Sequence, residues 1–215
     1  MDMNLTLTLT RACLTDVNNP FKNKPELITD PVFLIGNGAS RKEFDLERLR
    51  PIGTIIGCNA LYRDFTPDVL VAIDSKMLNE LTRAKYGTKE GETSFVITPH
   101  NRSVNVPNST KYKTGRFNTS GAFAMRLIKD AMKPKRCYML GMDAFPGNVY
   151  DGTKNYAAHT LKNFSGIHRF YLEVLRQSSD TIFINVNDKD GWPAEAENTG
   201  KYSHMTYELF EKIVM

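Results

Sequence analysis

Residues 32 to 40 read VFLIGNGAS, and this stretch decides which fold the rest of the chain can adopt. Four apolar residues in a row, Val32 to Ile35, are typical of a strand that is buried on both faces, as in a parallel sheet. Gly36 and Gly38 allow a tight turn and the close approach of other backbone, and Ser40 is a residue type that caps helices. We expect a strand, a glycine turn and a helix start, where backbone N–H groups and the helix dipole favour an anion such as phosphate.

The glycine turn alone is a weak signal. It lacks the third glycine of the dinucleotide-binding motif, whose place falls at or near Lys42, and it lacks the Lys-Ser or Lys-Thr ending of a P-loop. A plain connection between a strand and a helix explains these residues equally well. The case for a ligand site therefore depends on the other strand ends.

Strands and helices alternate along the whole sequence. Apolar runs predict further strands at residues 54–57, 68–73, 94–98, 136–140 and 181–185. Helical patterns predict a helix of about two turns before Pro51 and helices at residues 76–85, 119–132, 165–176 and 203–214. This alternation predicts an α/β fold, a Rossmann-like three-layer α/β/α sandwich with a mostly parallel sheet.

The composition is that of an ordinary globular chain with a small positive charge. Its 215 residues suit one α/β domain over residues 1–215, with residues 1–30 as an N-terminal arm and lead-in. The net charge of +4 favours a small anionic ligand over nucleic acid, which requires clustered Lys and Arg. No apolar run approaches the roughly 20 residues that span a bilayer, and residues 1–13 lack the features of a signal peptide.

Two features bear on compartment and assembly. Cys13, Cys58 and Cys137 are odd in number and form no CxxC pair, which is typical of reduced thiols and predicts a cytoplasmic protein. Residues 4–10 alternate Leu and Thr, so one hypothesis is a strand that pairs with a neighbouring subunit in a homo-oligomer.

Polar residues follow three more of the predicted strands. Asn59, Asp74 and Asp143 come just after the strands at residues 54–57, 68–73 and 136–140. Ligands in such sheets bind outside the carboxyl ends of the strands, so we expect these residues to lie near the glycine turn. Asn59 suits a side-chain amide that reads a base or sugar, or an Asn that closes a turn with its own backbone. Asp74 suits a helix cap, or a group that binds a ribose hydroxyl, a metal or an acceptor amine.

Thr119, Ser120 and Gly121 form a second predicted anion site, because they open a strongly helical segment. Capping alone explains one hydroxyl, but not two beside a glycine. The preceding residues 99–118 are polar and show little periodicity, which predicts a flexible basic loop over the site, with a plain solvated loop as the alternative. Its basic side chains are His100, Arg102, Lys111, Lys113 and Arg116.

The motifs GNGAS, CNALY, RFNTSG and LGMDAF, in this order and at these separations, resemble the bacterial sialyltransferases of glycosyltransferase family 42. They also resemble the related domain of the archaeal-type 6-hydroxymethyl-7,8-dihydropterin pyrophosphokinases, and the similarity spans residues 31–184. The first resemblance implies that the chain transfers a sugar from a nucleotide donor, expected to be a CMP-sugar, to a hydroxyl acceptor. The residues that we expect to bind the nucleotide are Gly36, Asn37, Gly38, Ser40, Asn59, Asp74, Arg116, Thr119, Ser120, Gly121 and Asp143.

The same resemblance implies the catalytic residues. Tyr150 and Tyr156 correspond to the tyrosines that stabilise the departing phosphate, and either His159 or His168 corresponds to the general base. A histidine suits the role of general base because its pKa lies near neutrality. Tyrosine hydroxyls can donate hydrogen bonds to the departing phosphate, so we expect that the transfer requires no metal or other cofactor. The loops after Gly121 and Asp143 are shorter than in those enzymes, and their small membrane-associating C-terminal portion is missing, so donor sugar and acceptor stay open.

Two alternatives remain at this point. A pyrophosphokinase of the hydroxymethylpterin type requires Mg²⁺ to bridge ATP phosphates, with Asp74 and Asp143 as its expected ligands. A non-catalytic protein that sequesters a nucleotide or sugar phosphate needs the glycine turn and Ser120, but neither the histidines nor the tyrosines.

Overall fold

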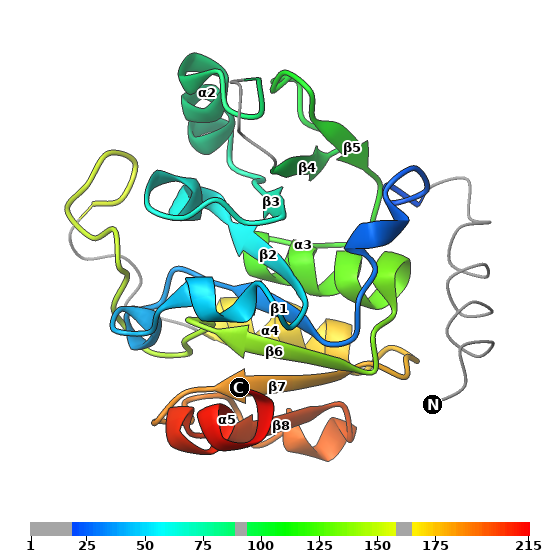
Figure 1. The fold of residues 1–215 in the computed structure, drawn as a ribbon, viewed down its shortest axis with the longest axis vertical. Helices are drawn as coiled ribbons and strands as arrows, with labels where there is room; N and C mark the ends of the chain where they lie inside the picture. The colour runs from blue at the N-terminus through cyan, green and yellow to red at the C-terminus, as the bar shows by residue number, and fades with distance from the viewer. Residues whose placement is uncertain (1–18, 89–93, 158–164) are drawn as a thin grey trace.

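The computed structural model describes residues 19–88, 94–157 and 165–215 of the chain (Figure 1). All the strands within these ranges belong to one eight-stranded sheet, whose order is β5-β4-β3-β2-β1-β6-β7-β8. Every pair of neighbours is parallel, which confirms the α/β prediction and makes the sheet wholly rather than mostly parallel. The strands are β1 (Val32–Ile35), β2 (Thr54–Cys58), β3 (Val69–Val71), β4 (Phe95–Pro99), β5 (Thr110–Tyr112), β6 (Arg136–Leu140), β7 (Ile182–Val186) and β8 (Tyr202–Met205).

Helices cover both faces of the sheet, as expected of a Rossmann-like sandwich (Figure 1). They are α2 (Ser75–Ala84), α3 (Ser120–Leu127), α4 (Ser165–Leu175) and α5 (Tyr207–Val214), and a π-helical turn at Ile128–Met132 continues α3. Within the described ranges, no helix is both long enough and apolar enough to cross a membrane.

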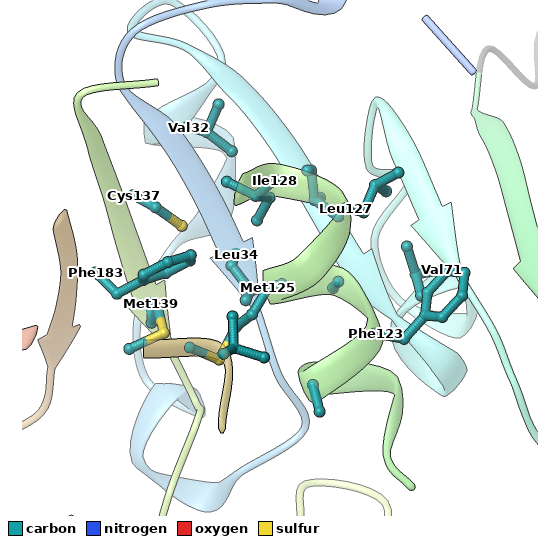
Figure 2. Packing of buried hydrophobic residues seen from close by; sticks show 14 of the residues in the cluster. Val32, Leu34, Val71, Phe123, Met125, Leu127, Ile128, Cys137, Met139 and Phe183 are labelled. Atoms are coloured by element: carbon teal, nitrogen blue, oxygen red, sulfur yellow. The ribbon is translucent and has the colours of Figure 1, made fainter. Parts of the chain in front are cut away.

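The strand β1 supplies both faces of the core. Its side chains alternate across the sheet, so Val32 and Leu34 pack with α3 and α4 on one face, while Phe33 and Ile35 pack with Phe210 of α5 on the other. Figure 2 shows α3 lying across the first of these faces. Burial of one such side chain contributes about 1.5 to 3 kcal/mol, which is why a continuous apolar run is needed here.

The chain reverses its direction of travel across the sheet at β1. β2 to β5 extend to one side of β1, and after β5 the chain returns through α3 to place β6 on the other side. The carboxyl ends of β1 and β6 therefore meet at a topological switch point, which is where open parallel sheets leave a crevice for ligands.

Three predicted elements were wrong in detail. The helix expected before Pro51 is two short 3-10 turns, at Ala39–Arg41 and Leu46–Leu49. The loop expected at residues 99–118 contains the edge strand β5. The helix expected from Ser203 begins at Tyr207, because residues 202–205 pair with β7 and the hydroxyl of Thr206 caps the helix by accepting from the Leu209 backbone N–H at 3.2 Å.

Candidate functional site

A cleft of about 230 Å³ opens at the switch point between β1 and β6. It draws its walls from the ends of β1, β2, β3 and β6, from the start of α3 and from residues 145–156. The predicted site residues that line it are Gly36, Asn37, Gly38, Asn59, Asp74, Thr119, Ser120, Gly121, Asp143 and Tyr156. The four motifs thus meet in one place, as the position of parallel strand ends requires.

The glycine turn is tied to the neighbouring strand end and does not form the phosphate cradle that we expected. The Gly36 N–H donates to the carbonyl of Leu140 and the Gly38 N–H donates to that of Gly141, both at 2.8 Å. A Cβ added at Gly36 would lie 2.2 Å from the Gly141 carbonyl oxygen. The glycines are therefore needed for close packing of two strand ends, and the 3-10 turn at Ala39–Arg41 is too short to supply a helix dipole.

Asp143 braces the same turn. Its carboxylate accepts from both the backbone N–H and the hydroxyl of Ser40, and from Nδ2 of Asn187 at 3.0 Å. A Cβ at Gly38 would lie 2.4 Å from this carboxylate, so the side chain fills the space beneath the turn. Burial raises the pKa of Asp143, and its hydrogen bonds from Ser40 oppose that rise. Ser40 itself does not line the cleft and acts through Asp143.

A buried arginine, which sequence analysis did not single out, supports the turn from behind. Arg41 is 4% exposed, and its Nε donates to the Gly36 carbonyl at 2.7 Å. Its guanidinium also donates to the hydroxyl of Tyr150 at 3.1 Å, and that hydroxyl donates to Asp64. Tyr150, expected to contact a departing phosphate, is thus buried behind the cleft with its hydroxyl engaged by two neighbours. No periodicity or motif marks Arg41 in the sequence.

The opposite wall of the cleft is built by Asn59 and the start of α3. Asn59 has the left-handed backbone (φ 51°) that Asn tolerates better than most residues. Its Oδ1 accepts from the Ser120 hydroxyl at 2.6 Å, while its Nδ2 donates to no other residue of the described ranges. Thr119 caps α3 by accepting from the Ala122 N–H at 3.1 Å, which leaves the amides of Ser120 and Gly121 at a helix N-terminus that faces the cleft.

A stack of three aromatic rings lies behind this wall. Tyr171 of α4 lines the cleft, and a Cβ at Gly121 would lie 2.7 Å from its hydroxyl. The ring of Tyr171 stacks on Trp192 with centroids 5.0 Å apart, and Trp192 stacks on Tyr202 at 4.8 Å. Because Trp192 is the only tryptophan of the chain, its fluorescence can report on ligands that touch Tyr171.

Tyr156 closes one end of the cleft. Its hydroxyl accepts from Nδ2 of Asn37 at 3.2 Å. The Oδ1 of Asn37 is buried without a hydrogen-bond partner in the described part of the chain. Burial raises the pKa of Tyr156 to about 12, so its hydroxyl keeps its proton at neutral pH and can donate it in a hydrogen bond.

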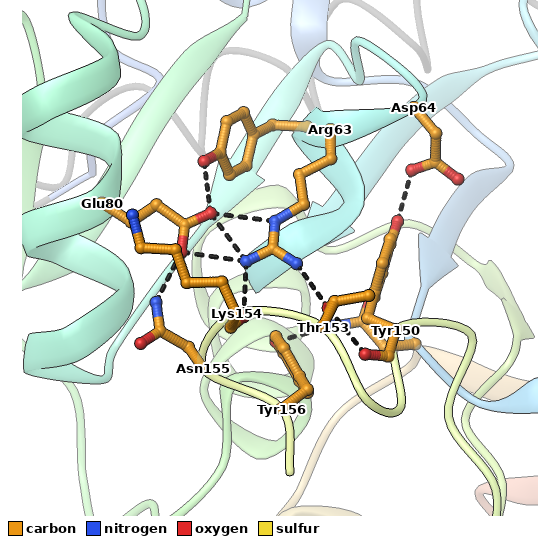
Figure 3. Close-up of polar contacts among 10 residues, drawn as sticks. Arg63, Asp64, Glu80, Tyr150, Thr153, Lys154, Asn155 and Tyr156 are labelled. Atoms are coloured by element: carbon orange, nitrogen blue, oxygen red, sulfur yellow. Dashed lines mark hydrogen bonds and ion pairs between the residues drawn. The ribbon is translucent and has the colours of Figure 1, made fainter. Parts of the chain in front are cut away.

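An ion pair holds the segment that carries Tyr156 (Figure 3). Arg63, which follows β2, donates from Nε and a terminal nitrogen to Glu80 of α2, at 2.8 and 2.9 Å. The same guanidinium donates to the Thr153 hydroxyl at 2.8 Å and to the Lys154 carbonyl at 2.7 Å. Glu80 is 8% exposed and accepts further hydrogen bonds from the side chains of Tyr62 and Asn155. We call this arrangement of Arg63 and Glu80 the clamp.

A second chamber of about 340 Å³ adjoins the cleft at Tyr156. The first turn of α2 and Asn155 form its outer part, with Lys76 as its basic residue. Its full lining is Asn59, Asp74, Ser75, Lys76, Met77, Asn155 and Tyr156. Asn59, Asp74 and Tyr156 line both spaces and therefore form the wall that the two share.

Three predicted residues lie elsewhere. Arg116 is exposed, and its carbonyl accepts from Nε of Arg126 at 2.8 Å. His168 is half-buried on α4, burial lowers its pKa, and it lines neither the cleft nor the second chamber. His159, like Cys13 and the Leu/Thr segment at residues 4–10, lies outside the described residues.

The charge of the cleft is unusual for a phosphate site. Asp74 and Asp143 are its charged lining residues, and among the described residues that line it there is no Lys or Arg. Within the same ranges, no group of three or more His, Cys, Asp or Glu side chains is placed to hold a metal ion. The cleft therefore offers mainly amides and hydroxyls, which recognise uncharged hydrogen-bonding groups.

We compared the chain with protein-family models, with curated proteins and with solved structures, and none of the three comparisons gave a match.

Proposed function

We propose that the cleft binds a nucleotide-activated sugar with a single phosphate, such as a CMP-sugar, and that the chain transfers this sugar to a hydroxyl acceptor. The observation that carries the proposal is the meeting of Asn37, Asn59, Ser120 and Tyr156 in one cleft at the switch point. Amides and hydroxyls suit the ribose and base of a nucleoside, and the first turn of α3 suits one phosphate. Tyr156 supplies a protonated hydroxyl for the oxygen that leaves with the nucleotide.

The charge of the cleft favours this donor over ATP. A triphosphate carries several negative charges and is ordinarily held by Lys, Arg and Mg²⁺ together. Two carboxylates without a lining cation oppose such a ligand. A magnesium ion held by Asp74 and Asp143 fits poorly as well, because the Asp143 carboxylate already accepts from Ser40 and Asn187. We therefore place the pyrophosphokinase second.

Location is a smaller part of the proposal. Cys58 and Cys137 are buried free thiols, and burial raises the pKa of Cys58 to about 12, so this thiol stays unreactive. Free thiols suit a reducing compartment, and we propose that the protein works in the cytoplasm.

The test is a thermal-shift panel of CMP, CDP, UMP, AMP and ATP, each with and without Mg²⁺. At 100 times its Kd, a ligand adds about 2.7 kcal/mol of stability, which for a chain of this size raises Tm by roughly 5 to 10 °C. We expect that rise with CMP in the absence of metal, and release of CMP when CMP-N-acetylneuraminate is supplied as the donor probe. Quenching of Trp192 gives a second measure of binding.

Matched variants connect the result to the cleft. Ser120→Ala removes the hydroxyl that holds Asn59 and should abolish most of the CMP shift. Asp180→Asn changes an exposed residue before β7, at the opposite end of the sheet, and should leave the shift intact. A shift with ATP that requires Mg²⁺ would support the pyrophosphokinase instead, and CMP binding without any CMP release would support a non-catalytic binder.

A further inference from the structure

The cleft and the second chamber meet at one shared wall, made of Asn59, Asp74 and Tyr156. If the cleft holds the sugar donor, as proposed above, the second substrate needs a space of its own that opens onto the donor. The second chamber, with a volume of about 340 Å³, is such a space. The reacting atoms of the two substrates can then meet only at the shared wall.

Of the three residues of this wall, Asp74 alone carries a side chain that can act as a base. The Asn59 amide is not basic, and Tyr156 holds its own proton because its pKa is about 12. Asp74 carries a carboxylate at the N-cap of α2. An N-cap Asp ordinarily accepts from a backbone N–H of the first turn, but the Asp74 side chain makes no such hydrogen bond.

The surroundings leave the Asp74 carboxylate available to a substrate. It accepts no hydrogen bond and forms no ion pair with any other residue in the described ranges, and it is exposed to the cleft. The charged and titratable groups that interact with it are Arg102, from the segment after β4, and Tyr156. Lys76 of its own helix lines the second chamber with it. Desolvation raises the pKa of Asp74 and the charge of Arg102 opposes that rise.

We propose that the second chamber binds a hydroxyl acceptor of the saccharide class and that Asp74 is the catalytic base that deprotonates it. The acceptor O–H gives its proton to the Asp74 carboxylate, and its oxygen forms a bond to the anomeric carbon of the donor sugar. The bond between that carbon and the phosphate oxygen breaks, and its electron pair leaves with the nucleotide. Tyr156 donates a hydrogen bond to the leaving oxygen, and Asn155 and Ser75 hold the acceptor through its other hydroxyls.

This assignment gives to a carboxylate the role that the resemblance gives to a histidine. His168 lines neither space, so it is not placed to reach the shared wall. Aspartate is a suitable base when the proton transfer is late. The acceptor hydroxyl becomes more acidic as its oxygen forms the bond to the anomeric carbon, so a weak base can then accept its proton.

The experiment compares Asp74→Asn with the wild type, with His159→Ala and with Asp180→Asn as the matched control. CMP release from CMP-N-acetylneuraminate is measured with lactose as the acceptor probe and with water alone, and CMP binding is measured by thermal shift. We expect Asp74→Asn to lower CMP release roughly 100-fold or more, while its CMP shift is equal to that of wild type or larger, because the variant removes a negative charge from the cleft. Asn is itself a good N-cap, so the variant should fold.

A pH profile separates a proton acceptor from a structural residue. Because only the carboxylate form accepts a proton, the wild-type rate should rise with pH through the pKa of Asp74 and then level off, and the residual rate of Asp74→Asn should lack that step. An Asp74→Asn variant with at least a third of the wild-type rate, or loss of activity confined to His159→Ala, would overturn the assignment. A wild type that neither binds CMP nor releases it overturns the proposed function first, whatever Asp74 does.

Discussion

The two walls of the cleft use the same kinds of residue for opposite purposes. On the wall formed by β1 and β6, the amides of Gly36 and Gly38 and the carboxylate of Asp143 all end in hydrogen bonds within the protein. On the wall formed by Asn59, Asp74 and α3, an amide, a carboxylate and the first helical amides have no such partner in the described ranges. A polar residue at a strand end therefore marks a ligand contact only where the fold leaves its hydrogen bonds unused.

The difference separates stability from binding. Gly36, Gly38 and Asp143 on the first wall hold two strand ends together, so their loss should destabilise the protein before it affects any ligand. Groups on the second wall are available, so their loss should affect ligands at little cost in folding free energy. Each variant below tests one part of that division.

The largest effect is expected at Gly36. Gly36→Ala places a methyl group 2.2 Å from a backbone carbonyl that cannot move without displacing β6. We expect a loss of about 3 kcal/mol or more in the free energy of unfolding, measured by urea denaturation. Gly152→Ala is the control, because Gly152 has a positive φ of 78° but nothing within 4 Å of an added Cβ, and it should cost only about 1 kcal/mol. Equal losses in the two variants would contradict the packing role of Gly36.

The two carboxylates give the most direct comparison. Asp143→Asn turns an acceptor of three hydrogen bonds into an amide that must present an N–H group to one of its donors, so we expect a loss of about 1 to 3 kcal/mol. Asp74→Asn removes no hydrogen bond to a described residue and should stay within about 0.5 kcal/mol of wild type. Urea denaturation of both variants measures the difference, and a larger loss at Asp74 would reverse the roles given to the two walls.

The general position of the site could be predicted from the sequence, because it follows from the topology. The apolar run before Gly36 identified a buried parallel strand, and parallel strands bring their carboxyl ends to one edge, so Asn59, Asp74 and Ser120 were expected together. That Asp143 and the glycine amides are engaged could not be predicted, since this depends on β6 being the neighbour of β1. Ser40 and Asp143, which are 103 residues apart, meet only because of that strand order.

The elements that sequence analysis missed share a physical cause. β5 and β8 are the two edge strands, and each has only three or four residues with exposed or half-buried side chains among them. Such strands lack the apolar run that identifies a central strand. They form because a neighbouring strand offers them backbone hydrogen bonds, which the local sequence does not reveal. Arg41 was missed because the contacts that bury it form only in the folded chain. Its guanidinium donates to the Gly36 carbonyl after β1 and to the Tyr150 hydroxyl, which in turn donates to Asp64.

The smallest effect is expected at the clamp, which joins the available wall to the rest of the fold. Arg63→Lys keeps the charge that Glu80 needs but cannot reproduce the fork that contacts Glu80, Thr153 and Lys154 together. We expect about 1 kcal/mol of lost stability and a several-fold weaker CMP affinity, because Tyr156 is then less firmly held against Asn37. Both are measured by urea denaturation and by Trp192 quenching.

Arg50→Lys is the matched control for the clamp, since the Arg50 guanidinium also contacts a glutamate and a backbone carbonyl, those of Glu47 and Thr66, but lines neither the cleft nor the second chamber. If Arg63→Lys loses stability but binds CMP as tightly as wild type, the clamp serves only the fold and the position of Tyr156 does not limit binding. If the CMP affinity of Arg63→Lys falls while that of Arg50→Lys is unchanged, then the hydrogen bonds of the clamp hold Tyr156 in the position that binds the ligand. The two walls would then differ in how far their internal hydrogen bonds lie from the ligand. On the second side, Tyr156 would face the ligand, and the hydrogen bonds of Arg63 and Glu80 behind it would hold it in place.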